Sequence, residues 1–197
     1  MDISNNPNEI ALLVSLTFFI AGIVKGVIGI GLPTTAITIM TFFVSPLTAL
    51  GLNLVPMTVS NIWQFGRADN PKELIKNYKY FAFFLSLCLL ITSFYAVQFG
   101  DDFVRLIFAV AVLLFVCLQV FGFNLKMNDK YDNFWQSLLG VFGGLIGGVA
   151  SIWAVPITMY LLMKNVTPKH FVDVSGFLIF IGCIPVSFGY IATGVFL

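Results

Sequence analysis

The fold of this chain is decided by the stretch Gly22-Ile-Val-Lys25-Gly26-Val-Ile-Gly29-Ile-Gly31-Leu-Pro33, which lies inside an apolar run long enough to cross a bilayer. Glycine permits unusual backbone angles, and proline removes a hydrogen-bond donor. The pattern therefore predicts that the helix opens near Gly31 and that a half-helix follows. We expect the first membrane element to be broken or bent.

A degenerate copy of this stretch returns 122 residues later as Gly144-Leu-Ile-Gly147-Gly148-Val-Ala-Ser151-Ile-Trp153-Ala-Val-Pro156. At this offset seven positions of 22–62 are identical. Both copies keep the same order of small-residue cluster, helix breaker, apolar half-helix and Ser/Thr-Pro. Two membrane segments interrupted at corresponding points are a sequence signature of a transporter's binding site. Structural breaks are expected at Gly22, Pro33, Gly144 and Pro156.

The composition excludes a soluble globular domain, since 59% of the residues are hydrophobic, 10% are charged and the mean hydropathy is +0.98. The first residues carry acid in place of Lys or Arg, so the first apolar run is expected to remain as a membrane segment. A net charge of +1 without a basic stripe indicates no nucleic-acid partner. The chain is predicted to be an all-α polytopic protein of the lipid bilayer.

About 20 apolar residues span the hydrocarbon core. On that basis we expect six membrane elements, in two related halves, 1–122 with four and 123–197 with two. The first and fifth elements are the broken ones and should pack centrally, because lipid cannot satisfy freed backbone groups. The elements are expected over 10–43, 46–66, 80–98, 103–123, 135–163 and 169–192.

The basic residues set the expected orientation in the cytoplasmic membrane. Connections 67–79 and 124–134 hold most of the Lys and Arg, so both are predicted to face the cytoplasm. The short connections near 44–46, 99–102 and 164–168 carry little positive charge and are expected on the opposite side. The N-terminus is cytoplasmic if the first element crosses once, and outside if that element is a re-entrant hairpin.

Lys25 is the most informative single residue, because it lies far from either end of an apolar run. A cation at that depth is expensive, so we expect it to face an aqueous cavity or a partner charge. The alternative is a lysine that snorkels or bonds to carbonyls exposed at the glycine break. The sequence leaves both readings open.

The other expected solute contacts lie around the two breaks. The half-helix after the first break should direct its N-terminal amides into the site, and such an N-terminus favours anions. Close helix packing is the competing explanation for the glycines. The predicted contacts are Gly26, Gly29, Gly31, Thr34 and Thr35 in the first copy, and Gly148, Ser151 and Trp153 in the second, with Trp153 as a cavity wall.

Two further polar groups stand out in apolar segments. Asn53 and Asn61 make the second element polar for a membrane helix, and they serve either interhelical hydrogen bonding or solute contact. His170 and Asp173 are three residues apart and share a helix face. They form either a proton relay or an interfacial pair near the helix start.

Enzyme motifs are absent from the sequence. It has one histidine, no Walker sequence, no His-Glu-x-x-His and no paired intramembrane carboxylates. The three cysteines show no metal-ligand or redox spacing. We therefore expect no catalytic activity, no cofactor and no bound metal.

At the glycine motif the chain resembles the sulfite exporter TauE/SafE family of membrane transporters. The resemblance rests on Gly22-xxx-Gly26-xx-Gly29-x-Gly31-Leu-Pro33 in the first half. In the second half it rests on Ser151-Ile-Trp-Ala-Val-Pro156-Ile-Thr-Met-Tyr160-Leu-Leu, where the family usually shows a Gly-x-Gly-Gly-Pro-Pro run. It implies a secondary transporter of small, often sulfur-bearing anions such as sulfite, thiosulfate or sulfonates, usually moved outward. It also implies that the glycine clusters around Gly26 and Gly148 form the core of the pathway, and it does not extend to Lys25.

Two departures from the family pattern bear on function. The second copy has lost several glycines, so its break and its substrate are open to change. Family members usually have further helices after the sixth span, so this chain reads as a fragment, a degenerate relative or part of an assembly.

The sequence thus predicts a secondary transporter whose two breaks meet near the bilayer midplane around a small anionic solute. The alternatives are an anion channel and a non-transporting subunit completed by a second copy or a partner chain.

Overall fold

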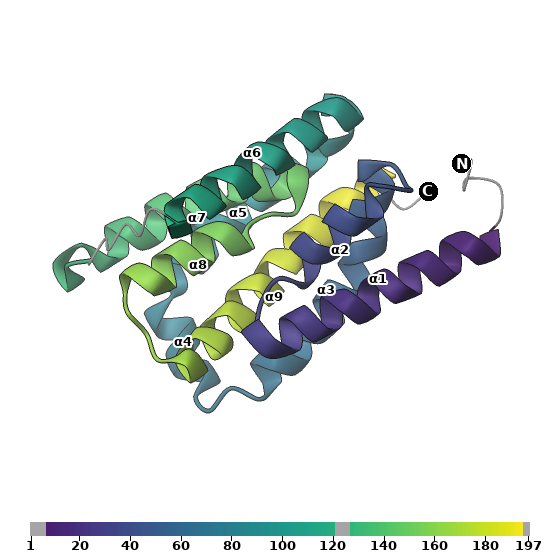
Figure 1. Ribbon diagram of the computed structural model, residues 1–197. Coiled ribbons are helices and arrows are strands. Elements are labelled where there is room, and N and C mark those ends of the chain that lie inside the picture. The colour runs from purple at the N-terminus through teal and green to yellow at the C-terminus, as the bar shows by residue number, and fades with distance from the viewer. Residues whose placement is uncertain (1–6, 121–126, 195–197) are drawn as a thin grey trace.

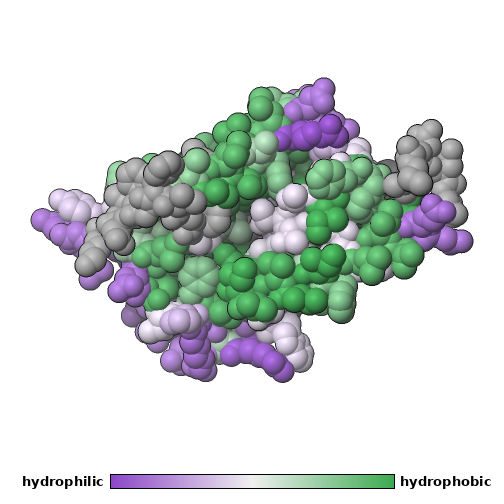
Figure 2. All heavy atoms as spheres, viewed as in Figure 1, coloured by the Kyte–Doolittle hydropathy of each residue, from purple (hydrophilic) through white to green (hydrophobic). Residues whose placement is uncertain are grey.

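The computed structural model describes residues 7–120 and 127–194, and within these ranges every regular element is a helix (Figure 1). By length and composition, two described helices can cross a membrane, Asn8–Ile28 and Pro168–Ala192. A third span is counted when the bent pair Pro71–Asn77 and Lys79–Ser93 is taken together. Figure 2 shows apolar residues over the middle of the molecule and charged residues at its ends. The expectation of an all-α membrane protein is confirmed.

The first element is broken where the glycine pattern predicts. Helix α1 (Pro7–Ile28) ends at Gly29, with φ of 87°, and α2 (Leu32–Met40) begins after Gly31, with φ of 101°. Both angles lie in the left-handed region, which favours glycine. Pro33 is in the first turn of α2, where its missing N–H costs no hydrogen bond. Gly22 lies inside α1, so the break expected there is wrong.

The fifth expected element, 135–163, is broken at the corresponding place. Helix α7 (Asp132–Ala150) ends at Ser151, with φ of 58°, and α8 (Ala154–Met163) follows. A serine thus occupies a left-handed position where the first copy uses glycine. Gly144 lies inside α7, so no break occurs there, and Pro156 is in the first turn of α8.

The helices that follow α2 and α8 begin alike, as the Ser/Thr-Pro signal predicts. Helix α3 (Pro46–Gly66) is capped by Ser45, whose Oγ accepts from Thr48 N at 3.2 Å. Helix α9 (Pro168–Ala192) is capped by Thr167, whose Oγ1 accepts from His170 N at 3.3 Å. The N-cap hydroxyl satisfies a donor that the first turn leaves free, and proline suits the first helical position.

The remaining elements lie between α3 and α7. They are α4 (Pro71–Asn77), α5 (Lys79–Tyr95), the 3-10 turn η2 (Ala96–Phe99), α6 (Gly100–Val120) and the 3-10 turn η3 (Asp129–Tyr131). Expected elements 46–66 and 169–192 match α3 and α9 to within a residue. The parts of the predicted element 103–123 and connection 124–134 that fall on 121–126 lie outside the described residues.

Both broken elements double back on themselves. Figure 1 shows α2 running opposite to α1, and α8 running opposite to α7. Lys164, at the end of α8, consequently bonds to Asp132 at the start of α7 at 2.8 Å, and Lys169 pairs with Asp69. Connection 164–168 therefore lies at the same end as 67–79, and the expectation that it faces the opposite side is wrong.

The two hairpins are packed very differently. Helix α7 lies against α5 so closely that a Cβ on Gly144 would be 2.3 Å from Cys88 Cβ, and one on Gly148 would be 2.0 Å from Thr92 Oγ1. Gly22 and Gly26 have nothing within 4 Å of the same position, and only 11% of the apolar window of α1 is buried. Central packing is confirmed for α7 and α8 and is wrong for α1, because α2 supplies the buried face of the first hairpin.

Candidate functional site

Lys25 is held by an amide on the neighbouring helix. Its Nζ donates to Asn61 Oδ1 at 2.6 Å, while Asn61 Nδ2 donates to the Met57 carbonyl at 2.7 Å. The second bond turns the amide so that its oxygen faces the lysine. Lys25 is half-buried and Asn61 is fully buried. The lysine thus has a neutral hydrogen-bond acceptor, and neither ion pair found in the described residues involves it.

An open groove of about 980 Å³ runs beside Lys25, between α1, α3 and the start of α9. Two of the four α1 residues that line it are glycines, Gly22 and Gly26, and Gly29 follows at the break. The groove brings the predicted residues Gly22, Lys25, Gly26 and Gly29 together. Its other lining residues are Val27, Leu32, Pro56, Val59, Ser60, Ile62, Trp63, Gln64, Arg67, Val172 and Asp173.

Gln64 anchors the first break and was not singled out by the sequence. Its Nε2 donates to the Gly29 carbonyl at 3.1 Å and to the Val172 carbonyl at 2.6 Å, and it lies 3.3 Å from Ser175 Oγ. The break is therefore tied to the first turns of α9. The available signal was spacing, because Gln64 falls one turn after Asn61 on the same helix.

The second break lies against another part of α9. Trp153 is only 1% exposed and packs between Gly147 and Gly182, and Tyr190 OH donates to the Gly148 carbonyl at 3.0 Å. The first break contacts Val172, ten residues or about 15 Å earlier along α9. The expectation that the two breaks meet is therefore wrong.

Four buried polar atoms have no hydrogen-bond partner within the described protein. Buried polar groups nearly always have one, and the Cys183 thiol and the Tyr190 hydroxyl lie within reach of Thr58 and Ser151 respectively. Two belong to α3 and two to the second break, and all lie in the segments predicted to contact solute. They are Asn53 Oδ1, Thr58 Oγ1, Ser151 Oγ and Trp153 Nε1.

Thr34 and Thr35 lie in the first turn of α2, as the sequence predicts, and both are half-buried. Neither lines the groove beside Lys25. Thr34 contributes its carbonyl to Thr38 Oγ1 at 2.7 Å. Their contact with a solute remains a prediction.

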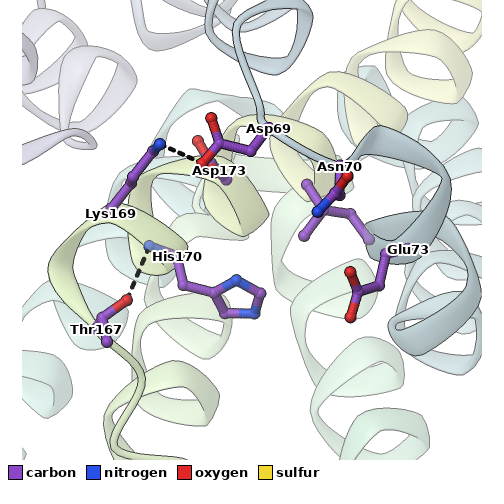
Figure 3. A pocket seen from close by; sticks show the side chains of 8 residues that line it. Asp69, Asn70, Glu73, Thr167, Lys169, His170 and Asp173 are labelled. Carbon is purple, nitrogen blue, oxygen red and sulfur yellow. Dashed lines mark hydrogen bonds and ion pairs between the residues drawn. The ribbon is translucent and has the colours of Figure 1, made fainter.

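His170 and Asp173 line a separate polar pocket of about 230 Å³ between α4 and α9 (Figure 3). The His170 Nε2 atom lies 2.8 Å from Tyr78 OH, and Lys169 bonds to Asp69 across the same pocket. Asp173 also lines the groove beside Lys25, so it borders both cavities. Within the described residues, no group of three His, Cys, Asp or Glu side chains is arranged to hold a metal.

The family model described as "Sulfite exporter TauE/SafE" matches residues 14–197. This range contains both breaks, both Ser/Thr-Pro helix starts and the whole lining of the groove. Neither a curated protein nor a solved structure matches the chain.

Proposed function

The chain belongs to the sulfite exporter TauE/SafE family of membrane transporters, and on that premise we propose that it carries a small anion across the cytoplasmic membrane. Sulfite, thiosulfate or another organosulfur anion is the proposed solute. Transport is secondary, by alternating access. The chain is proposed to perform no chemistry on its solute.

The observation that carries this proposal is Lys25 beside the groove. Lys25 lies in the last turn of α1, and an ammonium group inside a membrane protein faces water or a partner, because lipid does not solvate it. Its partner here is the Asn61 amide, which leaves the positive charge uncompensated. A small anion in the groove would supply the missing charge. The wall formed by Gly22, Gly26 and Gly29 leaves room for the anion to approach.

The orphaned polar atoms support a path that continues past Lys25. Trp153 Nε1 is a donor only, and the hydroxyls of Thr58 and Ser151 can donate as well. The Trp153 N–H, a donor without an acceptor among the described residues, suits an anion, whereas Asn53 Oδ1 can only accept. Thr58 lies beside Cys183, and Trp153 packs on the adjacent Gly182, so these donors lie near one level of α9.

The two units, 1–122 and 123–197, are proposed to be related halves that move against each other. The breaks, the helices that follow them and the Ser/Thr caps all recur at the offset of 122 residues. The α1/α2 hairpin opens toward one end of the molecule and the α7/α8 hairpin toward the other (Figure 1). Hairpins of opposite direction are typical of inverted repeats, which alternate access to a site between them.

The basic end of the molecule is proposed to face the cytoplasm. Lys72, Lys76 and Lys79 lie there with Lys130. The excess of Lys and Arg in short cytoplasmic connections sets this orientation. The start of α1 then lies on the outer side, which corresponds to the re-entrant reading of the first element.

A second candidate is a membrane subunit completed by another helix. The observation that favours it is the open face of α1, where neither Gly22 nor Gly26 meets any neighbour. A channel would use the same groove without a saturable bound state. The subunit and the channel each predict a flux that differs from that of a transporter.

The test is flux of sulfite and thiosulfate in proteoliposomes of the purified chain, with Lys25→Ala beside Lys72→Ala, an exposed lysine of α4 that does not line the groove. We expect saturable flux that Lys25→Ala lowers at least tenfold and Lys72→Ala leaves unchanged. Flux that rises linearly with anion concentration would favour the channel. No flux of either anion would exclude these two solutes and leave another organosulfur anion or the non-transporting subunit.

A further inference from the structure

The groove holds a second cation at the end where α3 stops. Arg67 follows Gly66, the last residue of α3, and is exposed. Its guanidinium carbon lies 4.5 Å from the centroid of the Trp63 ring, one turn earlier. Both residues line the groove together with Lys25. The stacked ring holds the guanidinium at the groove's mouth.

The donors of this guanidinium are unused. Among the described residues, no carboxylate pairs with Arg67, because the two ion pairs use Lys164 and Lys169. Stacking on an aromatic face engages the plane of the guanidinium and leaves the N–H groups at its edge free. These donors form a rigid fork that matches two oxygens of one oxyanion.

We infer that Arg67, stacked on Trp63, forms a mouth subsite that binds the oxyanion head of the transported solute before it reaches Lys25. The subsite favours solutes with paired oxygens, such as sulfite or a sulfonate, over spherical halides. Along α3, Arg67 lies six residues beyond Asn61, the partner of Lys25, which is about 9 Å of helix. The two cations therefore form successive positions along one groove.

Asp173 sets the strength of this subsite. Its carboxylate lines the groove on the α9 side and opposes a bound anion. Lys169 lines the adjoining pocket with Asp173 but is bonded there to Asp69, so it does not neutralise the Asp173 carboxylate (Figure 3). A site on a transport path must bind strongly enough to capture the solute and weakly enough to release it.

A phosphate group of a lipid headgroup has the same chemistry as the proposed solute. Arg67 and Trp63 lie at the end of a membrane helix, where such residues also anchor proteins at the interface. The experiment must therefore separate a soluble oxyanion from a lipid. It must also be independent of flux, because the inference rests on the proposed function.

The experiment is equilibrium binding of radiolabelled sulfite to the purified chain in detergent. Three variants are compared with the wild type: Arg67→Gln, Arg67→Lys and the matched control Lys72→Gln. We expect Arg67→Gln to raise the Kd about tenfold, since a hydrogen-bonded charge is lost. Arg67→Lys should recover less than half of the lost affinity on a logarithmic scale, because lysine lacks the fork of paired donors. Lys72→Gln should leave the Kd for sulfite unchanged. Chloride should compete poorly.

Several results would overturn the inference. They are an absence of sulfite binding, an unchanged Kd in Arg67→Gln, full recovery in Arg67→Lys, and Arg67-dependent binding of short-chain phosphatidylglycerol in place of sulfite. Binding that fails in Lys25→Ala and persists in Arg67→Gln would overturn it while leaving the proposed function intact. Arg67-dependent binding without flux would support the subsite and reject transport.

Discussion

The two broken hairpins share their sequence pattern and differ in what surrounds them. The second hairpin is sealed, with Gly144 and Gly148 pressed against α5 and Trp153 buried beside Gly182. The first hairpin is open, with Gly22 and Gly26 facing empty space and Lys25 beside a groove. The same glycine spacing thus serves close packing in one copy and lines a cavity in the other. Its role depends on the helix that lies opposite.

Matched glycine substitutions should give the largest difference between the hairpins. Gly148→Ala places a methyl group 2.0 Å from Thr92 Oγ1 and 2.8 Å from the Ser93 backbone nitrogen, and we expect it to lower the free energy of unfolding by about 3 kcal/mol. Gly26→Ala, at the equivalent position, places its methyl group where no atom lies within 4 Å. It should leave the free energy of unfolding unchanged or raise it by up to about 1 kcal/mol. Equilibrium unfolding in mixed detergent measures both. Equal losses would show that α1 is also closely packed.

Loss of the Asp132 network should be the next largest effect. Asp132 accepts hydrogen bonds from Tyr160 OH at 2.6 Å, Lys164 Nζ at 2.8 Å and Gln136 Nε2 at 3.0 Å, and so joins the start of α7 to the end of α8. Asp132→Asn should lower the free energy of unfolding by about 2 kcal/mol, since bonds to a half-buried charge are weakened.

The matched control for Asp132 is Asp69, whose pair with Lys169 is exposed to solvent. Surface ion pairs contribute little to stability. Asp69→Asn should therefore give no measurable change in thermal unfolding. A similar loss in both variants would contradict the view that the half-buried Asp132 network contributes more to stability than the exposed Asp69–Lys169 pair.

The left-handed positions at the breaks should respond in opposite directions. Gly31 has φ of 101° and ordinary contact with Val24 at 3.4 Å, so Gly31→Ala should cost about 1.5 kcal/mol through the backbone alone. Ser151 already bears a side chain at φ of 58°, so Ser151→Gly should gain about 1 kcal/mol. Thermal unfolding of the two variants tests this. A loss in Ser151→Gly would mean that its hydroxyl contributes to the fold.

The helix caps should show the smallest difference, because here the two copies agree. Ser45→Ala and Thr167→Ala each remove an acceptor for a first-turn N–H, and each should cost about 1 kcal/mol. The same unfolding assay applies. Costs that differ by more than about 1 kcal/mol would break the equivalence of the two helix starts.

Local features of the fold could be predicted because they depend on a few neighbouring residues. Glycine at Gly29 and Gly31 permits positive φ, and Ser45 and Thr167 cap the helices that follow them. The second break could also be located, although serine replaces glycine there. These are properties of the backbone and need no knowledge of the partner helices.

Features that depend on distant contacts could not be predicted. Connection 164–168 lies at the basic end because α8 turns back, which hydropathy does not reveal. Gln64 joins Gly29 to Val172 through a contact across 108 residues of sequence. Lys25 was expected to meet a cavity or a charge, and the structure supplies both a groove and the Asn61 amide.

The central claim is that the first break borders a water-filled path for anions, and thiol labelling tests it most directly. In a cysteine-free background, Gly26→Cys in the groove is compared with Phe19→Cys on the exposed face of α1, using an anionic methanethiosulfonate and a membrane-soluble maleimide. We predict that the anionic reagent labels Gly26→Cys at least tenfold faster than Phe19→Cys, and that adding Lys25→Ala slows this reaction. Labelling of both positions by the maleimide alone would show that the groove faces lipid and would contradict the account.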